Sequence, residues 1–229
     1  RLFKRMGLRV IANDFQQYAC ALNKAYLEIN TQPKFTRLRR AYQFAIIRQP
    51  ETQTPVEQVL TLLNNLEGVT GFISENYGPA ANRFYYSKEN AEKADAIRQT
   101  IAQWRELKLI TPNEYAYLLA SLLEAIDQVA NTASVYGAFL KKFKRSALRS
   151  LTMKPLELCG RVKGCKVFNE DANELIRKIE CDALYLDPPY NHRQYGANYH
   201  VLETIAAYDQ PVLTGVTGMR DYPRSRYCQ

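Results

Sequence analysis

The chain has 229 residues, with 31 Lys and Arg against 23 Asp and Glu, which gives a formal net charge of +8. No apolar run approaches the roughly 18 residues that a membrane-spanning helix needs, so we expect no membrane association. Five cysteines without paired spacing and only two histidines argue against a structural zinc site and predict no metal and reduced, cytoplasmic thiols. The basic excess is compatible with a polyanionic partner.

The first 30 residues predict a helix, a strand and a second helix. Residues 1–6 have the pattern of the last turns of a helix, and Gly7 would be its C-terminal cap. The apolar residues 8–12 predict a strand that ends near Asp14, and a helix should follow over about 16–29. An acidic side chain at a strand end can accept hydrogen bonds from the ribose hydroxyls of a cofactor. It can equally cap the next helix, so both roles stay open for Asp14.

The central part of the chain predicts a run of helices. Residues 54–57 (Thr-Pro-Val-Glu) and 111–114 (Thr-Pro-Asn-Glu) are capping boxes with proline at the first helical position. Ser87 should begin a helix that continues to about residue 107. A further helix is expected over 134–148, and it would end in a basic run.

The pattern returns to strands near residue 151. Residues 167–172 predict a strand that leads to Asp171, which could meet a cofactor or cap the short helix after it. The apolar run 183–186 predicts a short buried strand, which two prolines must end. Residues 197–207 should be helical, and the glycine-containing, basic tail 214–226 is expected to be a mobile loop that could cross DNA.

The residues that end the last predicted strand, Asp187-Pro188-Pro189-Tyr190, suit the recognition of a planar amine. Asp187 and the Pro188 carbonyl can each accept an N–H, and the ring of Tyr190 can stack on a flat substrate. Open α/β sheets place ligands at such carboxyl ends of strands. The plainer alternative is a strand-to-loop turn with a solvated Asp and a packed Tyr.

This tetrapeptide resembles the catalytic motif of amino-group, S-adenosylmethionine-dependent methyltransferases. The continuation, residues 191–195 (Asn-His-Arg-Gln-Tyr) and 198–204 (Asn-Tyr-His-Val-Leu-Glu-Thr), resembles the D12-class adenine-N6 DNA methyltransferases of restriction–modification systems. The resemblance implies S-adenosylmethionine as cofactor, double-stranded DNA as substrate, a flipped adenine stacked on Tyr190, no metal and a bacterial cytoplasmic location. It also leaves room for a cognate restriction endonuclease as a partner.

The implied fold class is α/β. A Rossmann-like methyltransferase core, formed by residues 1–33 and 151–229, would be interrupted by a mostly α-helical target-recognition insertion over 34–150, because neighbouring strands rarely lie over 100 residues apart. The resembled family carries a glycine-rich F-x-G-x-G turn before its second strand. Since that turn is not present here and the last residues end abruptly, we expect a core that is incomplete at both ends.

The resemblance also assigns site residues. It makes Asp187, Pro188, Pro189 and Tyr190 catalytic, and Asp14, Asp171, the Ala172 backbone N–H and Asp187 cofactor-binding. Basic side chains with the position to contact DNA are Arg83, Lys141, Lys142, Lys144, Arg145, Arg193 and Arg220.

Three alternatives stay open and one is disfavoured. Cytosine-C5 transfer needs a Pro-Cys nucleophile, and no Pro-Cys dipeptide occurs. Cytosine-N4 transfer uses nearly the same geometry, and an RNA amino-methyltransferase would also use a related motif. From a different class, the chain could be a truncated, non-catalytic DNA-binding module.

Overall fold

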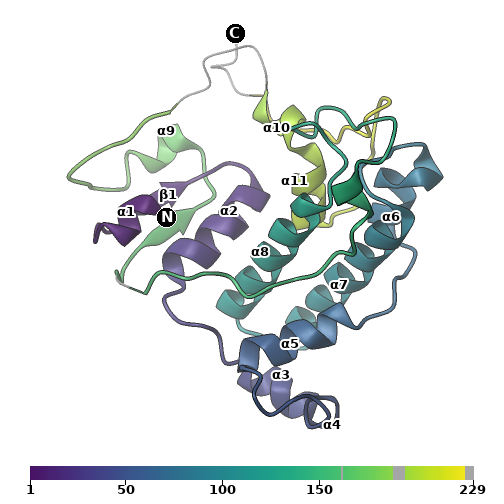
Figure 1. Ribbon diagram of the computed structural model, residues 1–229. Coiled ribbons are helices and arrows are strands. Elements are labelled where there is room, and N and C mark those ends of the chain that lie inside the picture. Colours follow the sequence, from purple (N-terminus) through teal and green to yellow (C-terminus); the bar gives the residue numbers. More distant parts are fainter. Residues whose placement is uncertain (161, 188–193, 225–229) are drawn as a thin grey trace.

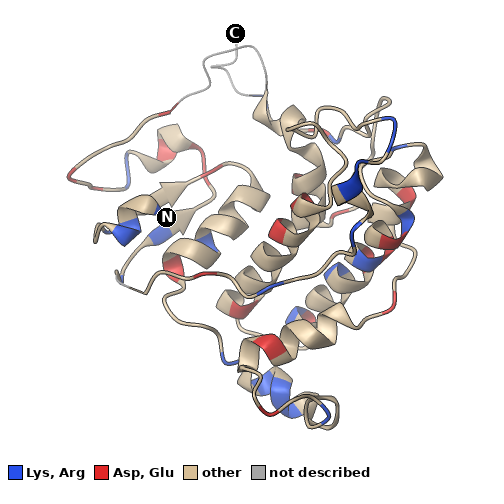
Figure 2. Ribbon diagram, in the orientation of Figure 1, with Lys and Arg blue, Asp and Glu red and all other residues tan. Residues whose placement is uncertain are grey.

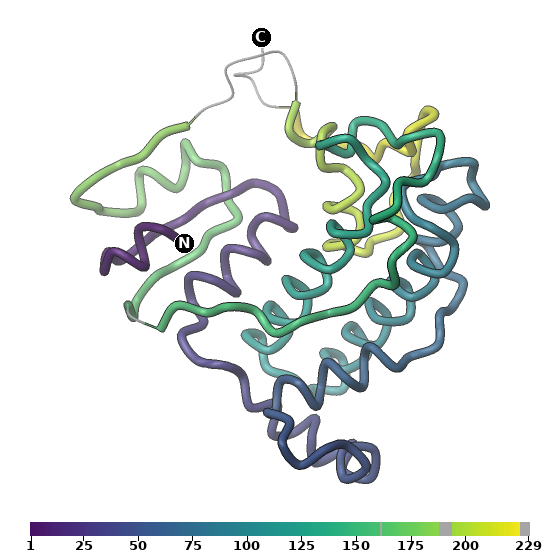
Figure 3. Tube along the Cα trace, viewed as in Figure 1, coloured from purple at the N-terminus to yellow at the C-terminus, as the bar shows by residue number. Residues whose placement is uncertain are grey.

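The computed structural model describes residues 1–160, 162–187 and 194–224. Figure 1 shows two parts, a small α/β piece that contains both chain segments of the sheet and a larger block of helices beside it. An extended segment, roughly residues 149–160, runs from the helical block across α8 (Pro112–Gln128) toward the α/β piece, as the trace in Figure 3 shows. The structure is therefore a mixed helix and sheet fold, compatible with a methyltransferase.

The α/β piece is built on two parallel strands. β1 (Ile11–Asn13) pairs with β2 (Lys166–Phe168) in a register that sets Ala12 opposite Val167. This parallel pair joins residues more than 150 positions apart, and it confirms that a strand precedes Asp14 and another precedes Asp171. Both strands are shorter than predicted.

Helices flank these strands. α1 (Leu2–Arg5) ends before Gly7, whose φ of +93° confirms the predicted helix end. α2 (Gln17–Asn23) continues into a π-helical turn, Lys24–Glu28, and α9 (Ala172–Leu175) follows β2. Cys20 and Leu27 pack with Cys165 and Val167, so this helix covers one face of the sheet.

The helical block follows the predicted starts closely. Its elements are α3 (Thr36–Ala41), α4 (Gln43–Ile46), α5 (Pro55–Asn64), α6 (Phe72–Tyr77), a 3-10 turn (Pro79–Ala81), α7 (Lys88–Glu106) and α8. Both predicted capping boxes are confirmed. The hydroxyl oxygens of Thr54 and Thr111 each accept the backbone N–H three residues on, and their own backbone N–H groups donate to the carboxylates of Glu57 and Glu114. Ser87 caps α7 as predicted.

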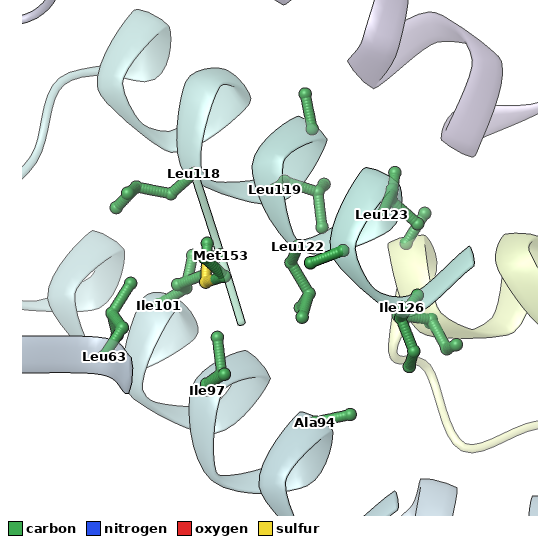
Figure 4. Close-up of a cluster of buried hydrophobic side chains, with 14 of the residues drawn as sticks. Leu63, Ala94, Ile97, Ile101, Leu118, Leu119, Leu122, Leu123, Ile126 and Met153 are labelled. Carbon is green, nitrogen blue, oxygen red and sulfur yellow. The ribbon is translucent and has the colours of Figure 1, made fainter. Parts of the chain in front are cut away.

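One hydrophobic core joins the helices. Figure 4 shows aliphatic side chains of α5, α7 and α8 interlocking with Met153 from the extended segment. The same core includes Ala25 of the π-helical turn and Val201 and Ile205 of α11 (His200–Ala207). Residues assigned from the sequence to the catalytic core and to the insertion thus share one interior, and the boundaries at 33/34 and 150/151 stay a prediction.

Two predicted elements are wrong. Residues 134–148 form an irregular segment with a 3-10 turn at Arg145–Leu148 instead of a helix. The reason is the buried Asn131, whose side-chain amide donates to the Phe84 and Leu140 carbonyls and accepts from the Lys144 backbone N–H. These bonds give the backbone an alternative to helical pairing.

The run 183–186 is not a buried strand. It has no ladder partner among the described residues, and Leu184, Tyr185 and Leu186 are 53%, 76% and 72% exposed. A strand that is apolar on both faces needs paired neighbours and covering layers, and β1 and β2 pair only with one another in the described chain. Further along the described chain, α10 (Tyr195–Asn198) and α11 confirm the expected helix near 197–207, although it breaks at Tyr199.

Two charged side chains of α7 hold the ends of neighbouring helices. Asp95 is fully buried and accepts the backbone N–H groups of Ile73 (2.9 Å) and Ser74 (2.8 Å) at the start of α6. Arg98, one turn later, donates to the Ile205 and Ala206 carbonyls (both 3.0 Å) at the end of α11. Each charge has the sign that favours the helix end it meets.

None of the helices in the described ranges is long and apolar enough to cross a membrane.

We expect Asp95→Ala to lower the free energy of unfolding by about 3 kcal/mol, because it leaves two buried N–H groups without an acceptor at roughly 1–3 kcal/mol each. Chemical denaturation measures this. Glu106→Ala, at an exposed position of the same helix, is the control and should stay within about 0.5 kcal/mol of the wild type. A loss below about 1 kcal/mol in Asp95→Ala would contradict the capping role.

Candidate functional site

The loops that follow β1 and β2 are joined by two asparagine side chains. The Asn13 amide donates to the Glu170 carbonyl (2.9 Å) and accepts the Glu170 N–H (3.1 Å). In return, the Asn169 amide donates to the carbonyls of Asp14 (2.7 Å) and Phe15 (2.9 Å). These bonds bring the two strand ends, and the carboxylates that follow them, to one edge of the sheet.

Two of the three predicted cofactor carboxylates, Asp14 and Asp171, lie at this edge. Asp14 Oδ1 accepts the Gln16 N–H (2.8 Å) just before α2, and burial raises the pKa of its carboxyl above the ordinary value in spite of that bond. Asp171 is exposed and caps α9 by accepting the Asn173 N–H (2.8 Å), with Ala172 as the first helical residue. The capping role of Asp171 is thus observed, and the cofactor role of both groups stays a prediction.

Glu203 of α11 is a site residue that the sequence analysis did not single out. Its two oxygens accept the backbone N–H groups of Gln17 and Tyr18, each at 3.0 Å, at the N-terminus of α2. A carboxylate is well placed there because it meets both unpaired donors and the positive end of the helix dipole. Burial raises the pKa of Glu203, and these two N–H groups oppose the increase. Glu203 therefore ties the segment after Asp14 to the helix that follows the D-P-P-Y run.

Three tyrosine rings form a row of contacts between α2 and α10. The rings of Tyr18 and Tyr199 have centroids 5.5 Å apart, and Tyr199 is stacked against Tyr195 at 6.4 Å with an interplanar angle of 12°. Burial, followed by the negative charges of Asp14 and Glu203, raises the pKa of Tyr18 strongly. Tyr18 is therefore a neutral phenol at physiological pH, beside two carboxylates.

The proposed catalytic run lies mostly beyond the described part of the chain. Asp187 is exposed at the end of a coil segment. Pro188, Pro189, Tyr190 and Arg193 are outside the described residues. A hollow of about 380 Å³ lies between residues 133–138 and α10, with Gln194, Ala197 and Asn198 on one wall.

The predicted DNA-contacting residues divide into two groups. Lys141, Lys142 and Arg145 are exposed, on residues 139–145, which we call the basic loop. Three others are engaged within the protein: Arg83 with backbone carbonyls, Arg220 with both oxygens of Asp209 (3.0 and 2.7 Å), and Lys144 with the Thr132 carbonyl (2.8 Å). In the described ranges, no group of three or more His, Cys, Asp or Glu side chains is arranged to hold a metal ion.

Comparison with known proteins gives one family and several relatives. The family model for D12 class N6 adenine-specific DNA methyltransferases matches residues 2–229. Type II methyltransferase M.NlaIII of Neisseria lactamica is 44% identical over 230 residues, which cover 100% of this chain and 63% of the relative. Type II methyltransferase M.FokI of Planomicrobium okeanokoites is 40% identical over 228 residues (96% and 33%). Modification methylase StsI of Streptococcus sanguinis is 37% identical over 230 residues (94% and 33%).

The chain thus spans between a third and just under two thirds of the length of these relatives. No solved structure matches it.

The raised pKa of Asp14 predicts a specific pH dependence. Because the folded state binds this proton more tightly than the unfolded state, the contribution of Asp14 to stability is complete below its ordinary pKa of 3.8 and is lost as the pH rises through the raised value. The wild type should therefore lose stability relative to Asp14→Asn between pH 4 and pH 7 in denaturant unfolding. Asp182→Asn, which replaces an exposed carboxyl group in the same way, is the matched control substitution. A wild-type advantage over Asp14→Asn that grows with pH would contradict this assignment.

Proposed function

Since the chain belongs to the D12 class of N6 adenine-specific DNA methyltransferases, we propose that the protein transfers a methyl group from S-adenosylmethionine to N6 of an adenine in duplex DNA, as the modification enzyme of a restriction–modification system. The family match over residues 2–229 carries this proposal, because it includes the whole D-P-P-Y run and both strand ends. Identities of 37–44% to proteins named as type II methyltransferases and modification methylases support it.

The residues at the sheet edge fit the proposed cofactor. Asp14 would accept hydrogen bonds from the ribose hydroxyls, while Asp171 and the Ala172 N–H would meet the adenine ring. S-adenosylmethionine, when bound, supplies an electrophilic methyl group, so the reaction needs no nucleophilic side chain. The joined loops after β1 and β2 support this assignment, since they hold both carboxylates at one edge.

The chemical task of the protein is then to position an amine. Asp187 and the Pro188 carbonyl would each accept an N–H of the target amino group, which favours a more tetrahedral and more nucleophilic nitrogen and stabilises the positive charge that develops on it. A base within a duplex cannot reach such a group, so the adenine would flip out and stack on Tyr190. The hollow beside α10, a helix that begins five residues after Tyr190 in the sequence, is a candidate place for an extruded nucleotide.

The basic loop is the part of the structure best suited to phosphates. Lys141, Lys142 and Arg145 are exposed on one short segment, and a duplex would be bound there through its backbone. A cognate endonuclease that recognises the same sequence would be the functional partner. Cytosine-N4 transfer remains the second candidate, because the D-P-P-Y geometry presents the same acceptors to either exocyclic amine.

Transfer of tritiated methyl groups to mixed-sequence duplex DNA, with the digested nucleosides identified, tests the reaction. Label in N6-methyladenine is the expected result. Label in N4-methylcytosine would favour the second candidate. Duplex binding without any transfer, both by these 229 residues and by a longer product of the same gene, would favour the non-catalytic binding module.

We expect Asp187→Ala to reduce methyl transfer by at least about 100-fold, the usual scale for the loss of a group that positions and stabilises the reacting atom. Its affinity for duplex DNA should remain within about twofold of the wild type. Asp182→Ala removes an exposed carboxylate five residues earlier and is the matched control for transfer and binding. Turnover like the wild type in Asp187→Ala would rule out the catalytic assignment.

Tyr190→Ala should weaken base flipping, because the extruded adenine loses its stacking partner. The fluorescence of 2-aminopurine at the target position would then rise less upon protein binding than with the wild type. Tyr185→Ala, which removes an exposed ring before the run, is the control. An equal rise in Tyr190→Ala and the wild type would contradict stacking on this ring.

A further inference from the structure

The tail of the chain forms a small fixed hairpin. Thr214 and Met219 exchange two backbone hydrogen bonds of 2.8 Å, which close the turn over Gly215–Gly218. We call residues 214–219 the tail hairpin. Gly215 (φ +69°) and Gly218 (φ +66°) both adopt left-handed conformations that favour glycine. The sequence analysis expected a mobile loop at this place.

Side chains from the helical block hold every carbonyl of the turn. Arg83 donates to the Gly215 and Val216 carbonyls, both at 3.1 Å. A ring nitrogen of the buried His200 lies 3.0 Å from the Thr217 carbonyl, and the hydroxyl of Tyr77 donates to the Gly218 carbonyl at 3.1 Å. With three of four consecutive carbonyls accepting hydrogen bonds from Arg83 and Tyr77, and the fourth in contact with the His200 ring, the backbone of the turn has one orientation.

The glycine at the end of the turn is also required by space. A Cβ on Gly218 would lie 3.0 Å from both Cδ and Nε of Arg83. The guanidinium therefore packs directly against the hairpin while it binds the carbonyls. Because the polar backbone faces inward, Val216 points away from the protein and is 80% exposed.

The short segment that holds the tail hairpin also holds the basic loop. Phe84, the residue after Arg83, packs its ring edge-on against Phe139 (6.0 Å) and Phe143 (5.7 Å) of the basic loop. In Figure 1 the yellow tail and the teal segment that contains the basic loop both appear at the upper right, and Figure 2 shows lysine and arginine on that teal segment. Two adjacent residues, Arg83 and Phe84, thus hold the tail hairpin with its exposed apolar tip and the basic loop with its exposed positive charges.

We propose that the tail hairpin is a DNA-contacting element, in which Val216 inserts as an apolar wedge at a groove of the duplex while the basic loop binds the phosphates. Arg83 is a positioning residue for this wedge and makes no phosphate contact itself. The inference rests on the proposed function for the identity of the polyanion. The neighbouring positive charges favour a nucleic acid, and a backbone fixed in advance has little entropy to lose on binding. Apolar side chains at the ends of rigid elements are a known means of opening base steps.

The test measures the affinity for a fluorescent mixed-sequence duplex at several salt concentrations. Val216→Ala should weaken binding by about tenfold, which corresponds to the loss of two buried methylene equivalents, and should leave the salt slope unchanged because no charge is lost. Val216→Thr keeps the shape of the side chain, and its affinity for the duplex should lie between that of the wild type and that of Val216→Ala. Val69→Ala, at an exposed valine outside both the tail hairpin and the basic loop, should bind like the wild type.

The slope of the logarithm of the binding constant against the logarithm of the salt concentration distinguishes two roles of Arg83, which are positioning the tail hairpin and binding a phosphate. Arg83→Met should weaken binding at least as much as Val216→Ala with an unchanged slope, and the double variant should be no weaker than Arg83→Met alone. Gly218→Ala disturbs the same contact without removing a charge and should give the same loss. By contrast, Lys142→Ala should reduce the slope by about 0.9, as expected for one phosphate contact. A comparable reduction in Arg83→Met would overturn the positioning role.

The remaining outcomes distinguish this inference from the proposed function. Binding by Val216→Ala within twofold of Val69→Ala would overturn the wedge, whatever the result of the methyl-transfer assay. Loss of self-association in Val216→Ala by sedimentation, with DNA binding unchanged, would also overturn it by assigning the hairpin to a protein partner. A chain that binds duplex through Val216 but transfers no methyl group to any nucleoside would support the hairpin and contradict the proposed reaction.

Discussion

The requirement that buried backbone groups find hydrogen-bond partners determines how the loops of this protein are built. The two described strands are only three residues long, so most of the loop backbone cannot use a sheet. Asparagine side chains take that place, because one amide group offers both a donor and an acceptor. Asn64 exchanges two bonds with Met153, and Asn90 binds Leu151 together with the carbonyls of Ala147 and Arg149. The extended segment that connects the helical block to β2 is held in this way.

Asparagine side chains also pair with loop backbone groups at the sheet edge, where the predicted cofactor-binding residues lie. Asn13 and Asn169 join the two loops that carry the predicted cofactor carboxylates, and Glu203 joins the first of these loops to α11. The helix that follows the D-P-P-Y run and the edge where a cofactor would lie are therefore linked by a bidentate contact. In the function that we propose, this contact would help to hold the two sides in place, as an in-line meeting of a methyl group and an amine requires.

The sequence was sufficient for those parts of the structure that depend on near neighbours. The capping boxes at Thr54 and Thr111 and the end of α1 at Gly7 each depend on interactions within a few residues, and all are confirmed. The errors have distant causes. The helix expected over 134–148 does not form because Asn131 binds the backbone of this segment and of Phe84, 47 residues away. The strand expected over 183–186 could form only beside neighbouring strands. The apolar composition of these four residues does not show whether such neighbours are present.

Arg83 shows why a basic residue in a DNA-binding family need not contact a phosphate. Its guanidinium is directed at three backbone carbonyls, those of Asn76, Gly215 and Val216, and these are neutral acceptors inside the protein. A pattern of residue types cannot distinguish this use of a positive charge from a phosphate contact, because both need the same planar donor group. The distinction follows only from what surrounds the side chain. Here the neighbouring Phe84 packs against Phe139 and Phe143 of the basic loop. In the function that we propose, the general attraction of a duplex would come from that loop and a local contact from the tail hairpin.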